Sequence, residues 1–342
     1  MIEVENLVKR YGNHMAVDHL SFKVDDGQVY GFLGPNGAGK STTMNMMTGY
    51  LAATEGTVKI NGFDILTQPE EAKKCIGYLP EIPPLYVDMT VGEYLKFVAE
   101  LKKVPKAERT EQVAEVMDAT QITDMKNRLI KNLSKGYRQR VGLAQAMIGK
   151  PDVIILDEPT VGLDPKQIIE IRELIAGLKK DHTVILSSHI LSEVSAICDQ
   201  IMIISKGKLV ACDTPEGLQN MMSATAELEI SVMGDADIFK GVVDAFEGVQ
   251  EFRFEDAHED GCVKALIITD SKVDIRKDLA VKLNELNMPV MSMNRVEKSL
   301  EDIFLTLTSD STSLHDIQQM QEQNDIQQTQ DQKEEKQDDS NI

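Results

Sequence analysis

The chain has 342 residues, of which 42% are hydrophobic and 27% are charged, and its formal net charge at pH 7 is -20. This length is comfortable for two domains and sufficient for a large buried core. Such an acidic surface repels the phosphate backbone of nucleic acids, so we expect no nucleic acid among the partners of this chain. A small nucleotide is still allowed, because a local site can override the field of the whole surface.

Three further features of the sequence limit the class of protein. The four cysteines are scattered without a C-x-x-C pair, which indicates neither a disulfide framework nor a zinc site and fits a reducing cytosol. The N-terminus is acidic and lacks the apolar segment of a signal peptide. Because no stretch approaches about 18 uninterrupted apolar residues, we expect any membrane role to come through a partner.

Short apolar runs and helical periods alternate over residues 1–222. The runs predict strands within 1–33 and over 58–60, 63–65, 153–156, 184–186 and 201–204. Apolar residues at three- and four-residue spacing predict helices from Lys40, within 91–150, and over 167–178 and 191–197. Alternation of this kind indicates an α/β domain with a mostly parallel sheet, here carrying a helical subdomain at about 88–150.

Composition shifts after Met222, and a second domain is expected over 226–308. The pattern predicts a strand at 228–232, a helix at 238–246, strands at 249–254 and 263–268, a helix at 273–286 and a strand at 290–293. That order is a split βαβ, ferredoxin-like α+β unit, and an amphipathic helix at 300–307 follows it. Residues 309–342 hold nine acidic residues and two lysines in a Gln-rich segment without apolar period, which predicts a disordered acidic tail.

A glycine-rich segment follows the apolar run Val29–Leu33 and precedes the predicted helix. It matches G-x-x-x-x-G-K-S and consists of Gly34, Pro35, Asn36, Gly37, Ala38, Gly39, Lys40, Ser41 and Thr42. Glycines let backbone N–H groups converge on phosphate oxygens, and the helix N-terminus adds a partial positive charge. We therefore expect ATP here, with Lys40 neutralising the β and γ phosphates and Ser41 binding Mg²⁺. The alternative is an ordinary Gly-rich turn.

Two acids, Asp157 and Glu158, end the apolar run Val153–Leu156. Ligands in open α/β sheets bind at the carboxyl ends of strands, which is where both side chains are expected. Asp157 suits the Mg²⁺ site, and Glu158 suits the general base that deprotonates an attacking water. Taken alone, the pair would be read as solvated acids at a strand end. The phosphate-binding pattern upstream is what favours the catalytic interpretation.

A third motif, L-S-K-G-Y-R-Q-R at 133–140, resembles the L-S-G-G-Q signature of ABC ATPases. The resemblance covers about residues 1–220 in the order of that family, and it includes D-E-P-T at 157–160, G-L-D-P at 162–165 and S-H at 188–189. It implies an ABC-type P-loop fold, hydrolysis of ATP, and pairing with a second nucleotide-binding subunit in a homodimer or heterodimer.

The resemblance also implies roles for single residues. ATP would be held between the phosphate-binding loop of one copy and the signature of the other. The residues acting in trans would then be Ser134, Lys135, Gly136 and Asp164. Tyr11 matches the aromatic residue that stacks on adenine, with a surface residue in a hairpin turn as the alternative. His189 matches the switch histidine that holds the γ phosphate.

The sequence departs from the family pattern at two sites. The signature has Lys135 in place of the second-position glycine and Tyr137 in place of the glutamine, but Ser134 and Gly136 are retained, so a working site is expected. Glu81 stands where the Q-loop glutamine is expected. A carboxylate can still ligate Mg²⁺ there, although it adds negative charge beside a triphosphate.

The segment 79–86 and the C-terminal unit are similar to a branch of the family near the gliding-motility and multidrug export subunits. That branch pairs with ABC-2-type permeases, which implies a cytoplasmic subunit held peripherally at the membrane through the permease. The docking surface would lie around Pro84–Tyr94. Leu85, Tyr86 and Val87 are apolar enough for a partner surface, and they would equally suit packing in the chain's own core.

Two other functions fit parts of the sequence. A soluble ABC ATPase acting on DNA or ribosomes is disfavoured by the acidic charge, the single nucleotide domain and the lack of a long coiled coil between Lys40 and Ser134. A non-catalytic regulatory nucleotide binder is disfavoured because Lys40, Glu158 and His189 are all present, while Glu81 leaves it open. The sequence favours the ATP-hydrolysing subunit of a membrane transporter and does not name its substrate.

Overall fold

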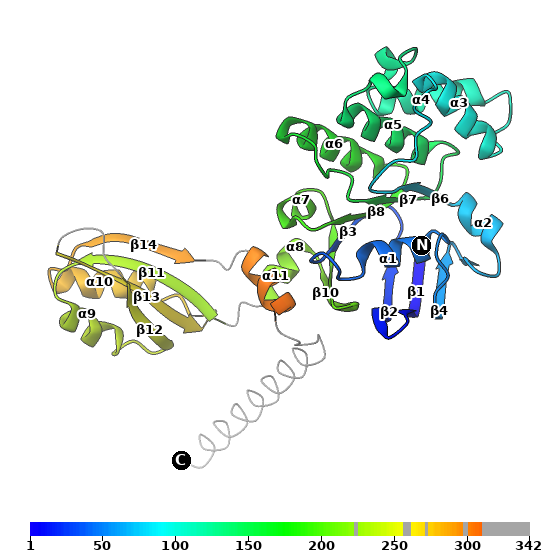
Figure 1. The fold of residues 1–342 in the computed structure, drawn as a ribbon. Helices are drawn as coiled ribbons and strands as arrows, with labels where there is room; N and C mark the ends of the chain where they lie inside the picture. The colour runs from blue at the N-terminus through cyan, green and yellow to red at the C-terminus, as the bar shows by residue number, and fades with distance from the viewer. Residues whose placement is uncertain (222–224, 256–260, 271–272, 297–299, 310–342) are drawn as a thin grey trace, which may run out of the picture. The chain divides into compact units, whose positions relative to one another are not determined.

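The computed structural model describes residues 1–221, 225–255, 261–270, 273–296 and 300–309. Within these ranges the chain forms two compact units, Met1–Pro215 together with the end of the last helix from Leu305, and Glu216–Phe304. Figure 1 shows the elements of both units. Residues 310–342, nearly all of the segment predicted as an acidic tail, lie outside the described ranges.

The smaller sheet of the first unit has the strand order β2-β1-β4-β5. Its strands are β1 (Ile2–Tyr11), β2 (His14–Val24), β4 (Glu55–Ile60) and β5 (Phe63–Asp64). β1 pairs antiparallel with both β2 and β4. The turn expected at Asn61-Gly62 is confirmed, because it joins β4 to β5.

The larger sheet has the order β10-β9-β3-β8-β7-β6. Its strands are β3 (Val29–Leu33), β6 (Ile76–Leu79), β7 (Val153–Asp157), β8 (Thr183–Ser188), β9 (Gln200–Ser205) and β10 (Lys208–Asp213). All pairs are parallel except β9 with β10, so the sheet is mixed. The carboxyl ends of β3, β8 and β7, three adjacent strands, therefore meet at one edge, where an open α/β sheet binds its ligand.

Some helices of the first unit pack on these sheets, and others form a helical subdomain. They are α1 (Lys40–Met47), α2 (Pro69–Lys74), α3 (Val91–Leu101), α4 (Arg109–Ala119), α5 (Lys135–Met147), α6 (Pro165–Leu178) and α7 (Leu191–Ser195), with two 3-10 turns, η1 (Thr123–Met125) and η2 (Ile130–Asn132). The helices α3, α4 and α5 share an apolar core that includes Leu95, Val113 and Val141, which confirms the helical segment predicted within 91–150.

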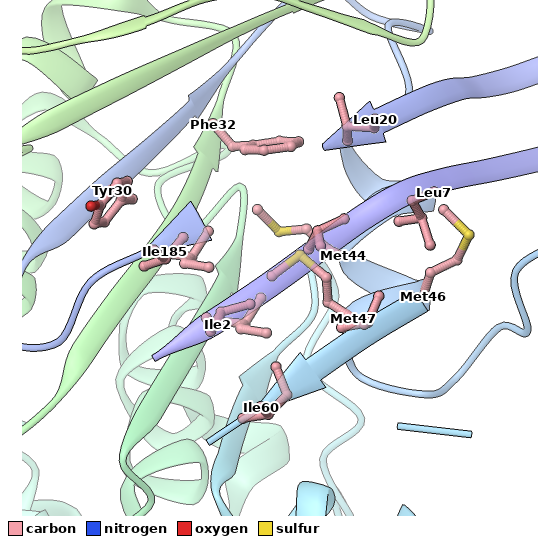
Figure 2. Packing of buried hydrophobic residues seen from close by; sticks show 14 of the residues in the cluster. Ile2, Leu7, Leu20, Tyr30, Phe32, Met44, Met46, Met47, Ile60 and Ile185 are labelled. Atoms are coloured by element: carbon pink, nitrogen blue, oxygen red, sulfur yellow. The ribbon is translucent and has the colours of Figure 1, made fainter. Parts of the chain in front are cut away.

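The main core of the first unit lies between the two sheets. Figure 2 shows Met44, Met46 and Met47 of α1 among Ile2 of β1 and Ile60 of β4, and all five belong to one buried cluster. The same cluster includes side chains of the larger sheet, Phe32 and Ile185 among them. Methionine is unbranched and adaptable, so it fills the irregular space between two twisted sheets. This packing holds the N-terminal end of α1 at the carboxyl end of β3.

The second unit is an antiparallel sheet with two helices on one face. Its elements in chain order are β11 (Thr225–Met233), α9 (Ala236–Val243), β12 (Val249–Glu255), β13 (Cys262–Asp270), α10 (Arg276–Glu285) and β14 (Val290–Val296). The strand order is β12-β13-β11-β14. Alternate residues Leu228, Ile230 and Val232 of β11 share a core with Phe239 of α9 and Leu279 of α10. The flanking helices are α8 (Pro215–Met221) and α11 (Leu300–Ser309).

Several helix ends differ from the sequence prediction by a few residues, and four short elements were not predicted. The helix α7 ends at Ser195 instead of 197, and α9 ends at Val243 because the N–H groups of Ala245 and Phe246 bond three residues back in a tight turn that keeps the apolar period. The helix α10 starts at Arg276, whose backbone N–H is capped by the carboxylate of Asp274. The unpredicted elements are α2, β6, α8 and β10.

Candidate functional site

The loop between β3 and α1 lines a cavity of about 450 Å³. The predicted site residues that line it are Tyr11, Asn36, Gly37, Ala38, Gly39, Lys40, Ser41, Thr42, Glu81, Glu158 and His189. They come from β1, from the loop and first turn of α1, and from the segments after β6, β7 and β8. Of the other residues expected on the same copy, Gly34, Pro35 and Asp157 do not line this cavity but contact Lys40 or Ser41, which do.

Gly39 allows the chain to turn from the loop into α1. Its φ is 105°, a left-handed conformation, and a Cβ there would lie 2.5 Å from the carbonyl oxygen of Ala16. Only glycine fits such a position without strain. The loop can therefore bend tightly around the cavity, with the free N–H groups of the first turn of α1 at its inner end.

The ammonium of Lys40 is buried at the centre of the loop, with the side chain 6% exposed. Its Nζ donates to the carbonyl oxygen of Gly34 at 2.8 Å and lies 3.6 Å from Oε1 of Glu158. Burial lowers the pKa of Lys40, while the charges of Glu158 and Asp157 act in the opposite direction. The lysine thus bridges the loop and the acid pair, in the position where an anion in the cavity would meet a cation.

The two acids are held by the neighbouring strand. Oδ1 of Asp157 accepts from Ser187 Oγ at 2.6 Å and from Ser41 Oγ at 3.3 Å. The backbone N–H of Glu158 donates to the same Ser187 Oγ at 2.9 Å. Ser187 therefore satisfies one hydrogen-bonding group of each acid, and Ser41 and Asp157 bring a hydroxyl and a carboxylate oxygen together.

Glu158 and His189 form a hydrogen-bonded pair at the cavity wall. Nδ1 of His189 lies 2.9 Å from Oε2 of Glu158. Glu158 is 7% exposed and has a φ of 48°, which is uncommon for a residue other than glycine. Such strain is often found where a side chain must be aimed at a ligand. The two side chains predicted as base and switch are thus brought together directly after two adjacent strands, β7 and β8.

Tyr11 and Glu81 lie at the rim of the cavity. The ring of Tyr11 is 50% exposed, and Nζ of Lys9 lies 5.4 Å from its centroid. An open aromatic face next to a phosphate-binding loop can take a planar base. Glu81 is exposed and lines both this cavity and an adjacent one of about 920 Å³.

The residues expected to act in trans form a second group, and none of them lines the cavity of its own copy. Ser134 is the N-cap of α5 and accepts from the backbone N–H of Tyr137 at 3.4 Å. Asp164 is the N-cap of α6, with Oδ1 accepting from the backbone N–H of Gln167 at 2.9 Å. The two helix starts pack together, because a Cβ at Gly136 would lie 2.6 Å from the Gln167 side chain.

The side chain of Lys135 is exposed but also contacts the second group of residues. A Cβ at Gly162 would lie 2.1 Å from Lys135 Nζ, so the lysine side chain rests on the loop between β7 and α6. Among the described residues, no carboxylate lies within ion-pair distance of this ammonium. The start of α5 therefore combines a capped helix N-terminus with an exposed positive charge.

Within the segment Pro84–Tyr94, some residues pack in the chain's own core and others are exposed, as a partner surface would require. Leu85 packs against the core of α3 to α5, as the packing alternative predicts. Tyr86 and Val87 are 57% and 43% exposed. The ring of Tyr86 stands edge-on to Phe97 with centroids 5.4 Å apart, so it is held in place while its other side faces solvent.

Sequence reasoning missed three polar side chains next to the site, Ser187, Thr160 and Glu193. All three are buried, and Thr160 Oγ1 donates to Glu193 Oε2 at 2.6 Å. Thr160 and Ser187 stand beside the recognised motifs, but nothing in the spacing of Glu193 marks it. Its contacts depend on how α7 packs in the fold, and the spacing of apolar residues in the sequence does not indicate that packing.

Comparisons with known proteins agree with this geometry. Residues 17–161 match the family model described as ABC transporter. The chain is 33% identical over 316 residues to the bacitracin transport ATP-binding protein BcrA of Bacillus licheniformis, covering 91% of this chain and 98% of that protein.

Solved structures give the same result. An ATP-binding subunit of an ABC transporter superposes with a TM-score of 0.59 at 30% identity over 64% of this chain and 92% of that one. The dimeric structure of MJ0796, a bacterial ABC transporter cassette, has a TM-score of 0.57 at 25% identity over 63% and 98%. In the described ranges we find no helix with the length and apolar character needed to cross a membrane. The chain belongs to the family of ABC transporter ATP-binding subunits and is an ATPase of that family.

Proposed function

We propose that the chain hydrolyses Mg-ATP in the cavity below the β3–α1 loop, and that hydrolysis drives transport by a separate membrane permease. The observation that carries this proposal is the convergence of Lys40, Ser41, Glu158 and His189 on one cavity lined by a glycine-rich loop. The β and γ phosphates would accept from the loop N–H groups and from Lys40. Tyr11 would stack on the adenine ring.

Mg²⁺ would be held by Ser41 and Asp157, with Glu81 close by. The donor set fits, since hydroxyl and carboxylate oxygens are the ligands this ion prefers. In the described ranges no group of three or more His, Cys, Asp or Glu side chains gathers as a self-sufficient metal site. This agrees with an ion that takes one or two protein ligands and completes its shell with phosphates and water. When bound, Mg²⁺ would neutralise charge on the β and γ phosphates.

Glu158 would act as the general base. Its carboxylate accepts a hydrogen bond from His189 and forms an ion pair with Lys40, and the two contacts together fix its orientation. It would take the proton of a water that attacks the γ phosphate, while His189 and Lys40 hold the phosphate oxygens. Burial of Glu158 in the cavity wall strengthens the electrostatic interactions of its carboxylate.

The site would be completed by a second nucleotide-binding subunit. The signature residues Ser134, Lys135 and Gly136 do not line the cavity of their own chain. Ser134 and Lys135 are exposed and give α5 a positively charged N-terminus. Such a terminus suits the γ phosphate bound to another copy. Asp164, on the loop packed against it, would link the two sites. ATP would favour the closed pair because only closure adds these contacts.

The permease would dock around Pro84–Tyr94, with Tyr86 and Val87 as the exposed apolar contacts. An ABC-2-type permease fits the family branch that this chain resembles, and the subunit would sit on the cytoplasmic face of the membrane. We assign residues 1–222 to the ATPase domain and 226–308 to a ferredoxin-like accessory domain, a proposal supported by the strand order of the second unit. A Tyr86→Asp variant should keep basal ATPase and lose co-purification with the permease, and retained co-purification would remove this surface.

The test of the catalytic assignment is the variant Glu158→Gln. It keeps the shape of the side chain and removes the base, so we expect ATP to bind and turnover to fall by about 10² or more. The matched control is Glu173→Gln, the same change at an exposed position on α6. Undiminished hydrolysis by Glu158→Gln in a phosphate-release assay would remove Glu158 from the role of base.

A further inference from the structure

A buried carboxylate behind the cavity has no part in the chemistry described so far. Glu193, on α7, is 4% exposed and does not line the nucleotide cavity. Its Oε2 accepts from Thr160 Oγ1 at 2.6 Å and from Ser188 Oγ at 3.1 Å. Its Oε1 lies 3.8 Å from a guanidinium nitrogen of Arg172 on α6, which supplies the counter-charge.

The two hydroxyls belong to the two segments that carry the reacting side chains, the loop after β7 and the carboxyl end of β8. Thr160 lies two residues after Glu158, and Ser188 comes directly before His189. One carboxylate oxygen is therefore bonded to both segments at once. We infer that Glu193 is a positioning residue, which holds Glu158 and His189 in register through Thr160 and Ser188. This inference rests on the proposed catalytic roles of Glu158 and His189.

The bridge is needed because packing alone does not fix the pair. His189 is 41% exposed at its side chain, and Glu158 is held in a left-handed conformation. In the described part of the chain, their 2.9 Å contact is the one direct link between the two side chains. A displacement of about 1 Å between reacting groups can cost up to 10²-fold in rate. Two hydrogen bonds to one charged oxygen resist such a displacement more strongly than bonds to a neutral acceptor would.

Stability alone gives little reason for a charge at this position. Removing a carboxylate from water is costly, and an apolar side chain of similar volume often stabilises a core as well or better. Arg172 does not make the pair an optimal ion pair, since its Nε is buried without a partner in the described ranges. The contribution of Glu193 is then to hold the segments that carry Glu158 and His189 in a fixed relative position.

The clearest test uses Thr160, because it bonds Glu193 without lining the cavity. Thr160→Val keeps the shape and removes the hydroxyl, whereas Thr160→Ser keeps the hydroxyl. We expect Thr160→Val and Glu193→Ala to lower kcat by about tenfold or more with KM within about twofold, and Thr160→Ser to retain wild-type kcat. The charge-matched control is Glu173→Gln on α6, which should match wild type.

A second readout does not depend on turnover. The Nδ1 resonance of the His189 imidazole, assigned with a His189→Gln variant, reports its bond to Glu158 in nucleotide-free protein. We expect it to shift in Thr160→Val and to stay unchanged in Thr160→Ser and Glu173→Gln. An unshifted resonance in Thr160→Val, or equal loss of kcat in the Val and Ser variants, overturns the positioning role. Absence of ATPase activity in the wild-type chain would instead count against the proposed function and leave the resonance to decide the positioning role.

Discussion

Replacing Ser187 by alanine should damage both stability and catalysis, because this one hydroxyl serves both acids of the site. Ser187 is fully buried on β8. Its Oγ donates to Asp157 Oδ1 at 2.6 Å and accepts from the backbone N–H of Glu158 at 2.9 Å. The substitution Ser187→Ala leaves Oδ1 of Asp157 with the longer hydrogen bond from Ser41 and removes the acceptor of the backbone N–H of Glu158.

The size of the effect follows from these two bonds. A hydrogen bond to a charged group contributes about 1.5–3 kcal/mol, and an unsatisfied buried donor costs about 1–3 kcal/mol. Ser41 still donates to Asp157 at 3.3 Å and offsets part of the loss. We therefore expect the free energy of unfolding of the first unit to fall by about 3 kcal/mol. Because Glu158 is also released from β8, kcat should fall by about 10 to 100-fold.

Two assays check this prediction. Urea unfolding followed by far-UV circular dichroism measures the loss of stability, and phosphate release at saturating ATP measures kcat. The control is Ser192→Ala, the same change at an exposed position on α7. A loss of stability below about 1 kcal/mol together with wild-type kcat would show that Ser187 does not hold the acid pair and would refute the reasoning.

Three further predictions follow from other contacts. Lys40→Met removes the ammonium that lies 3.6 Å from Glu158, and we expect about 100-fold weaker binding of a fluorescent ATP analogue; affinity within threefold of wild type would contradict this. Lys135→Gly should leave ATP binding to the single chain unchanged and raise the dissociation constant of the ATP-bound dimer about tenfold by sedimentation, whereas an unchanged constant would remove Lys135 from the interface. Burial of its ammonium lowers the pKa of Lys102 from 10.5 to about 8, so between these values the unfolded state binds more protons and stability should rise with pH. Because the residue as a whole is exposed, solvent screening keeps this rise to about 1 kcal/mol. That rise should be missing in Lys102→Met, and identical pH profiles of urea unfolding would refute it.

The strands that carry the site could be predicted because each is a clear apolar run that ends at a glycine or an acidic residue. The buried run Val29–Leu33 ends at Gly34, and the run at 153–156 ends at Asp157, so both strands and their loops could be located from the sequence. The strands β6 and β10 were missed for different reasons. β6 has only four residues, and β10 is an edge strand of partly exposed residues that is defined by its antiparallel pairing with β9.

The supporting side chains around the site could not be predicted, because their roles depend on contacts between elements far apart in the chain. Thr160 follows β7 and Glu193 lies on α7, 33 residues later, and they meet because α7 packs against β8, the neighbour of β7. The same holds for Leu85 and Tyr86, which are adjacent in sequence but differ in burial. Composition marked both as apolar, and only the fold separates the residue that packs inward from the one left exposed.

Complementation between two inactive variants tests the shared site most directly. Lys40→Ala removes the phosphate-binding cation of one half, and Ser134→Arg blocks the signature of the other half, so each variant alone should have no turnover. Mixed dimers would contain one site built from an intact Lys40 and an intact Ser134. We predict that an equimolar mixture recovers about a quarter of wild-type ATPase activity, as expected for random pairing in a symmetric dimer. A mixture as inactive as its components would contradict a site shared between two copies.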